Sequence, residues 1–94
     1  MSESLRTLIV EDRASDAKLA VRELERAGFD PNWQRVETEE QYLSQLEASP
    51  ELILADYNMP EFGAMRALEV LQEKGLDIPF IIVSGVLGDE LAVQ

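Results

Sequence analysis

Acidic and hydroxyl side chains follow three separate apolar segments of the sequence, at the point where each segment ends. They are Glu11 and Asp12 after residues 8–10, Asp56 after residues 52–55, and Ser84 after residues 78–83. If these segments are parallel strands of one sheet, their carboxyl ends meet at one edge, which is where ligands bind in open parallel sheets. We therefore expect acids that are far apart in the sequence to converge, provided that the first and third strands are neighbours.

The chemistry open to such a cluster is that of carboxylates around a cation. Converging carboxylates repel one another, and each raises the pKa of the others unless a cation lies between them. Because the sequence has no histidine and no cysteine, an oxygen-only site favours Mg²⁺. Beside such a cation Asp56 can attack a phosphoryl group to form an acyl phosphate, and the Ser84 hydroxyl can donate a hydrogen bond to a phosphoryl oxygen. The alternative for any single acid is that it caps a helix or faces solvent.

Short apolar runs alternate along the chain with segments of helical periodicity. The strands expected are residues 5–10, 33–36 after a turn at 30–32, 52–55 and 78–83; the helices expected are residues 15–27, a short one through Tyr42 and Leu46, and residues 64–74. This alternation indicates right-handed crossovers and a parallel sheet covered on both faces, so the fold class is α/β. Residues 89–94 begin a further helix-like pattern, at which the sequence stops.

Local signals mark where two of these helices begin and one ends. Ser15 or Asp16 can cap the first helix, and Gly28 stands just past its end, where a left-handed residue is favoured. Thr38 and Gln41 have the spacing of a capping box, which predicts the start of the short second helix.

Length and composition exclude several classes of protein. The 94 residues can make one domain, and 46% hydrophobic content is enough for a core. A net charge of −11, with the eight cations dispersed, argues against direct nucleic-acid binding. Without histidine or cysteine, thiolate zinc sites and Ser-His-Asp or Cys-His catalysis are excluded. No apolar run approaches the roughly 18 residues of a membrane span, and the acidic start is not a signal peptide, so a cytoplasmic protein is expected.

The motifs at the ends of the apolar segments together resemble the receiver domain of two-component response regulators. They are Glu11-Asp12, Asp56-Tyr57-Asn58-Met59-Pro60 and Val83-Ser84-Gly85, in that order. The resemblance covers essentially the whole chain. It implies a flavodoxin-like (CheY-like) fold with sheet order 2-1-3-4-5.

The resemblance also implies a role for each site residue. Asp56 would be the phosphoacceptor, and Ser84 the hydroxyl that senses the phosphoryl group. Asp12 and the backbone carbonyl of Asn58 would join Asp56 as Mg²⁺ ligands, with Glu11 supporting the site through water. The implied metal set is therefore Glu11, Asp12, Asp56 and Asn58.

The sequence departs from the family at its end. In receivers a fifth strand carries a lysine that pairs with the phosphate, and an aromatic switch residue; neither occurs here, and Lys18 and Lys74 do not end strands. We therefore expect residues 1–94 to be a receiver domain incomplete at its C-terminus, with strand order 2-1-3-4 and no fifth strand. The fourth strand would then be an open edge, which invites dimerisation or domain swapping with another copy.

Three functions follow as hypotheses. The first is a phosphoacceptor module of a two-component phosphorelay, which is not an enzyme. It would receive a phosphoryl group from a histidine kinase or phosphotransfer domain. It would then change its contacts with partners, such as an output domain of the parent chain. The second is a receiver-like interaction or dimerisation module that is not phosphorylated. The third is an aspartyl-phosphate phosphatase, which would want a general acid at the position of Asn58.

Overall fold

The computed structural model of the protein describes residues 3–57, 59, 62–83 and 91–93. Strands and helices alternate along the chain until the last two elements, which are both strands. The elements are β1 (Glu3–Val10), α1 (Ala14–Arg26), β2 (Phe29–Val36), α2 (Glu39–Leu46), β3 (Leu52–Asp56), α3 (Ala64–Glu73), β4 (Phe80–Val83) and β5 (Leu91–Val93).

The strands form one sheet in the order β2-β1-β3-β4-β5. β1 pairs in parallel with both β2 and β3, and β3 pairs in parallel with β4. The predicted α/β class and the parallel order 2-1-3-4 are thus confirmed, and this is the order of the first strands of flavodoxin-like folds. The adjacency of β1 and β3, on which the expected convergence of acids depends, is part of that order.

The end of the sheet differs from the prediction. Residues 89–94 were expected to begin a helix and the fourth strand to be an edge, whereas β5 (Leu91–Val93) pairs antiparallel with β4, Ile81 lying opposite Val93. A helix of six residues is marginal because nucleation is costly, while a short strand beside β4 takes up backbone groups that an edge would leave unpaired. Among the described residues β4 is therefore an inner strand, and the fifth position holds a short antiparallel strand.

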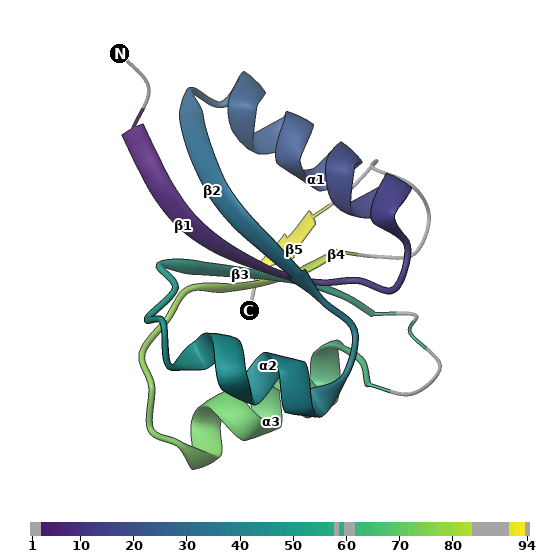
Figure 1. Cartoon of the computed structure of the whole chain (residues 1–94), viewed down its shortest axis with the longest axis vertical. Coiled ribbons are helices and arrows are strands. Elements are labelled where there is room, and N and C mark those ends of the chain that lie inside the picture. Colours follow the sequence, from purple (N-terminus) through teal and green to yellow (C-terminus); the bar gives the residue numbers. More distant parts are fainter. Residues whose placement is uncertain (1–2, 58, 60–61, 84–90, 94) are drawn as a thin grey trace.

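Helices cover both faces of the sheet, with α1 on one face and α2 and α3 on the other (Figure 1). Strand side chains alternate between these two sides. The core on the α2 and α3 side includes Leu8, Val10, Ile53, Ala55 and Ile82, and the core on the α1 side includes Ile9, Ala17, Val21, Leu52 and Leu54. Because β1 and β3 are buried on both faces, they appear in the sequence as continuous apolar runs.

The first helix begins one residue before the expected caps. Its N-cap is Arg13, which makes no side-chain capping bond, so the prediction of Ser15 or Asp16 is wrong. The carbonyl of Arg13 accepts a 3.1 Å hydrogen bond from the Ala17 N–H, which is the first hydrogen bond of the helix. Gly28, just past the helix, has a φ of 97°, in agreement with the predicted left-handed residue.

The second helix begins as predicted. The Thr38 hydroxyl accepts a 3.2 Å hydrogen bond from the Gln41 N–H, and the Gln41 side chain accepts one of 3.3 Å from the Thr38 N–H. This reciprocal pair is a capping box, which satisfies two backbone donors at the helix start.

The second strand is longer than its sequence suggested. The expected turn at residues 30–32 lies inside β2 (Phe29–Val36), which includes Pro31. A proline is tolerated there because β2 is the outer strand of the described sheet, where a missing N–H need not break a ladder bond.

Candidate functional site

Three acids converge where β1 and β3 end. Val10 lies opposite Ala55 in the parallel register, so that Glu11 and Asp12 leave β1 beside Asp56, the last residue of β3. Carboxylate oxygens of these three acids lie within 4.8 Å of one another. The convergence expected from the sequence is therefore present in the structure.

The carboxyl group of Glu11 is buried at the base of this cluster, with the residue only 6% exposed. Burial is the main cause that raises its pKa from 4.5 to about 8, and the charge of Asp56 and a hydrogen bond with the Asp12 side chain act in the same direction. A 3.1 Å hydrogen bond from the Arg13 N–H to Glu11 Oε2 opposes the shift. Burial and the neighbouring acids therefore favour the protonated form of Glu11 when no cation is bound.

The backbone of Glu11 is held by the end of β2. Its N–H donates a 2.9 Å hydrogen bond to the Val36 carbonyl, and its carbonyl accepts one of 3.1 Å from the Arg35 guanidinium. The same nitrogen of Arg35 forms a 2.9 Å ion pair with Glu37. Sequence reasoning missed Arg35, because an isolated arginine in an expected strand reads as a solvated side chain and only the β1–β2 pairing brings it to Glu11.

The backbone after Asp56 stays attached to the sheet for one more residue. The Tyr57 N–H donates a 3.1 Å hydrogen bond to the Val83 carbonyl of β4, while the Tyr57 side chain is 57% exposed. The chain then approaches itself, since a Cβ placed on Gly63 would lie 3.4 Å from the Tyr57 carbonyl oxygen. Gly63 is also the N-cap of α3, so the segment that follows Asp56 leads directly into that helix.

Two residues assigned from the resemblance, Asn58 and Ser84, lie outside the described part of the chain. Their parts in metal binding and phosphoryl sensing stay predictions. Of the four implied metal ligands, the structure brings together Glu11, Asp12 and Asp56.

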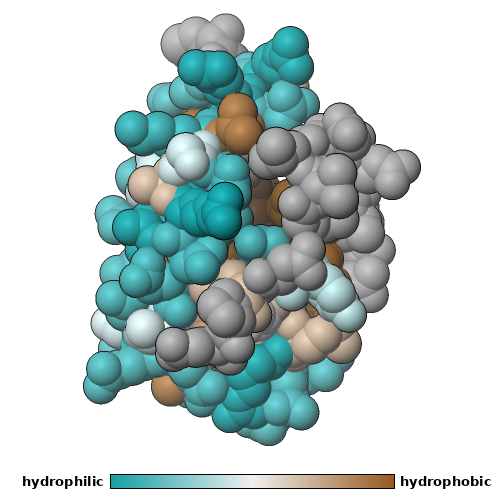
Figure 2. All heavy atoms as spheres, turned by 90° about the vertical axis from the view of Figure 1, so that its right-hand side faces the viewer, coloured by the Kyte–Doolittle hydropathy of each residue, from teal (hydrophilic) through white to brown (hydrophobic). Residues whose placement is uncertain are grey.

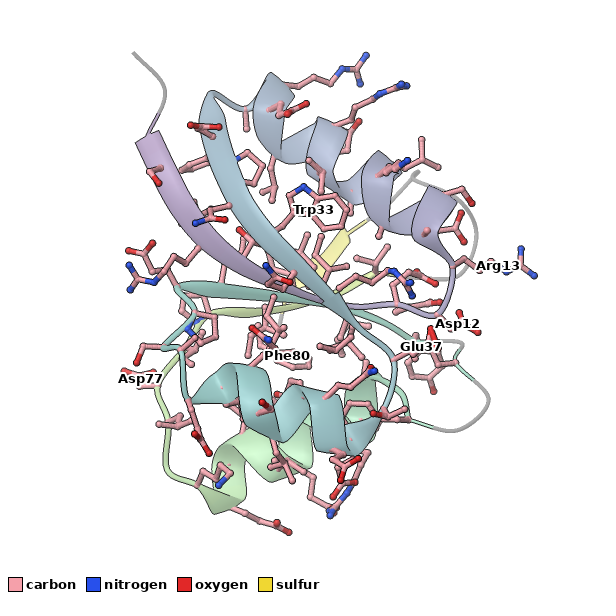
Figure 3. All side chains as sticks on the ribbon, in the orientation of Figure 1. Asp12, Arg13, Trp33, Glu37, Asp77 and Phe80 are labelled. Carbon is pink, nitrogen blue, oxygen red and sulfur yellow. The ribbon has the colours of Figure 1, made fainter. Side chains whose placement is uncertain are left out.

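The arrangement has the chemistry of a metal site. It concentrates three carboxyl groups, one buried, one partly buried and one exposed, and offers oxygen ligands alone, which suit a hard divalent cation. Asp12 and Arg13 lie on one side of the molecule, away from Asp77 on the other (Figure 3). Figure 2 shows the side that carries Asp12, where hydrophilic residues predominate among those coloured. Asp12 is the exposed member of the cluster and is therefore in contact with solvent.

Comparisons with known proteins show the fold alone. No protein-family model matches the chain, and no curated protein matches it. Among solved structures, a fusion that joins a trimeric coiled coil of yeast Spc42, amino acids 181–211, to a second protein is similar to it, with a TM-score of 0.73 and 21% identity. The likeness covers 95% of this chain and 57% of that chain. Within the described residues, every helix is too short or too polar to cross a membrane.

Proposed function

We propose that this chain is a phosphoacceptor module of the receiver type, in which Asp56 accepts a phosphoryl group. The observation that carries the proposal is the convergence of Glu11, Asp12 and Asp56 at the carboxyl ends of adjacent parallel strands. The order of the parallel strands and the position of Asp56 as the last residue of β3 agree with the receiver resemblance seen in the sequence. Asp56 is only partly buried, which agrees with a role as acceptor.

The proposed step is the transfer of a phosphoryl group to a carboxylate. An Asp56 oxygen attacks phosphorus, a new O–P bond forms, and the bond from phosphorus to the donor breaks. With an acyl phosphate donor the leaving group departs as a carboxylate. With a phosphohistidine of a kinase or phosphotransfer domain whose other ring nitrogen carries a proton, the leaving group departs as a neutral imidazole that keeps the electron pair of the P–N bond. No oxidant or reductant takes part.

The same proposal assigns Mg²⁺ to the acid cluster. Glu11, Asp12 and Asp56 would hold the ion directly or through water, and the bound ion supplies charge neutralisation for the incoming phosphoryl oxygens. The direction of the Glu11 pKa shift agrees with this assignment, because burial and the neighbouring carboxylates disfavour an uncompensated negative charge there.

The test is labelling by a small acyl phosphate, such as acetyl phosphate, with and without Mg²⁺. We expect intact-mass spectrometry to show the gain of one phosphoryl group in the presence of Mg²⁺, and the label to be lost with hydroxylamine, which cleaves acyl phosphates. Asp56→Asn should not be labelled. Asp77→Asn is the matched control, because Asp77 is an exposed aspartate on the opposite side of the molecule. Equal labelling of Asp56→Asn and the unchanged protein would overturn the proposal.

A phosphatase would behave differently in the same assay. An acceptor module gains one phosphoryl group and releases it slowly, whereas a phosphatase turns over many equivalents of a small phosphate ester. Steady release of phosphate from such an ester, with no labelled protein, would favour the phosphatase hypothesis.

A further inference from the structure

Two described residues between β3 and α3, Met59 and Phe62, pack in the hydrophobic core. Met59 is partly buried and packs against the core on the α2 and α3 side, and Phe62, a few residues on, is 5% exposed and belongs to that core. The backbone that leaves Asp56 therefore returns to the interior before α3 begins. Packing of these side chains limits how far the backbone beside the acids can move.

Tyr42 of α2 contacts Phe62 within this core. Its ring, which is fully buried, lies 5.2 Å from the ring of Phe62 between centroids, at an interplanar angle of 55°. Its hydroxyl donates a 2.8 Å hydrogen bond to the carbonyl of Ala67 in the first turns of α3. Burial raises the pKa of Tyr42, so the hydroxyl remains a neutral donor. The Tyr42 side chain thus contacts both Phe62, two residues before α3, and the first turn of α3 itself.

Backbone contacts connect Phe62 to the acid cluster. Gly63, the next residue, lies beside that backbone: a Cβ added to Gly63 would be 3.4 Å from the Tyr57 carbonyl oxygen and 3.8 Å from that of Asp56, which is ordinary van der Waals contact. Tyr42, Phe62 and Gly63 are thus successive neighbours that lead to the backbone of Asp56.

We propose that Tyr42 is a positioning residue for the acid cluster, acting through Phe62 and Gly63 on the backbone of Asp56. It touches neither the cation nor the phosphoryl group. By fixing the segment after β3, it keeps the Asp56 carboxylate within reach of Glu11 and Asp12 and so reduces the ordering that a bound cation must impose. The inference rests on the proposed function only in that the cluster binds Mg²⁺.

The experiment is a calorimetric titration of the whole chain with MgCl₂. We expect Phe62→Leu to weaken Mg²⁺ binding by about tenfold, and Tyr42→Phe, which loses only the hydroxyl, to weaken it by a smaller factor. Val21→Ala is the control, because Val21 is a buried residue of α1, in the core on the other face of the sheet. This variant should be less stable to urea and yet bind Mg²⁺ as tightly as the unchanged protein. If the substitutions acted only through a general loss of stability, Val21→Ala would weaken Mg²⁺ binding as well.

A double variant tests the route. If Tyr42 acts through Phe62, then Tyr42→Phe adds little to the loss caused by Phe62→Leu; fully additive losses would overturn the route. Unchanged Mg²⁺ affinity in both single variants, with Asp56→Asn abolishing binding, would overturn the inference and leave the metal site standing. Absence of Mg²⁺ binding by the unchanged protein would overturn both.

Discussion

The guanidinium of Arg66 in α3 binds the carboxylate of Glu39 in α2 through two hydrogen bonds, of 2.8 Å and 3.0 Å. It joins the two helices that cover one face of the sheet, and Arg66 also bonds Glu69 on its own helix. Because both partners are about 40% exposed, water and salt screen the pair strongly. We therefore expect Arg66→Ala to reduce the free energy of unfolding slightly, and by less in high salt, in urea titrations at two ionic strengths.

Arg66→Lys separates charge from geometry in that pair. A lysine keeps the positive charge but cannot form the two parallel bonds, so its stability should fall between those of the arginine and alanine proteins. The hydrogen bond from Arg66 lowers the pKa of Glu39, so the difference should shrink in acid as Glu39 becomes protonated. A difference that is the same at both ionic strengths would show that packing, and not charge, is responsible.

Glu11 should make the stability of the metal-free protein depend on pH. Its pKa is about 8 in the folded protein against 4.5 ordinarily, so the folded state holds a proton that the unfolded chain releases. The stabilisation is therefore fully present below about pH 4.5 and is lost as the pH rises through about 8. Urea unfolding in the presence of a chelator should show this fall, with a slope for this group of at most about 1.4 kcal/mol per pH unit.

Glu11→Gln isolates this contribution from the other carboxyl groups. Glutamine has a similar shape and no ionisable group, so the difference in stability between the two proteins should change across this pH range and be flat above it. Parallel pH profiles of the two proteins would contradict the burial argument.

Asp12 should support the site when a cation is bound. Asp12→Asn removes a charge near Asp56 but also the carboxylate that forms a hydrogen bond with Glu11, so the two effects oppose each other and the stability of the metal-free variant should change little. Added Mg²⁺ should raise the unfolding temperature of the unchanged protein and raise that of the variant much less. Differential scanning calorimetry with and without Mg²⁺ measures both effects, and an equal Mg²⁺ response in the two proteins would exclude Asp12 as a ligand.

The turn between α1 and β2 should depend on Gly28. Its φ of 97° is strained for other residues, although a Cβ there would meet no atom within 4 Å. Gly28→Ala should therefore lower the free energy of unfolding by about 1 kcal/mol for conformational reasons alone, and Gly28→Asn by less, since asparagine tolerates left-handed backbone better. Urea unfolding of the three proteins should rank them in that order, and equal values for alanine and asparagine would contradict it.

The sequence indicates the central strands and the acid cluster because burial on both faces leaves a clear pattern. Residues 52–55 form an apolar run that ends in Asp56, so strand and site residue are visible together. The outer strand β2 was predicted too short because Asp30 and Pro31 are turn formers, and only its outer place in the sheet makes them acceptable. β5 could not be foreseen, because a three-residue strand depends on pairing with β4 more than on its own residues.

The contacts that support the site have no local signal at all. Tyr42 is a plausible core residue from the sequence, but its contact with Phe62 arises only when α2 and the segment before α3 pack together. The same holds for Arg35, whose bond to the Glu11 carbonyl spans two strands. Site residues at strand ends can be predicted, whereas the residues that hold them in place depend on tertiary packing.

Pro31 has a consequence for the behaviour of the protein at high concentration. With β5 beside β4, β2 is the outer strand on the opposite side of the sheet, and Pro31 contributes no N–H there for an added strand to bind. Asp30 and Arg35 place charges on the same strand, and a net charge of −11 repels like molecules. The outer border of β2 is thus a poor template for edge-to-edge aggregation.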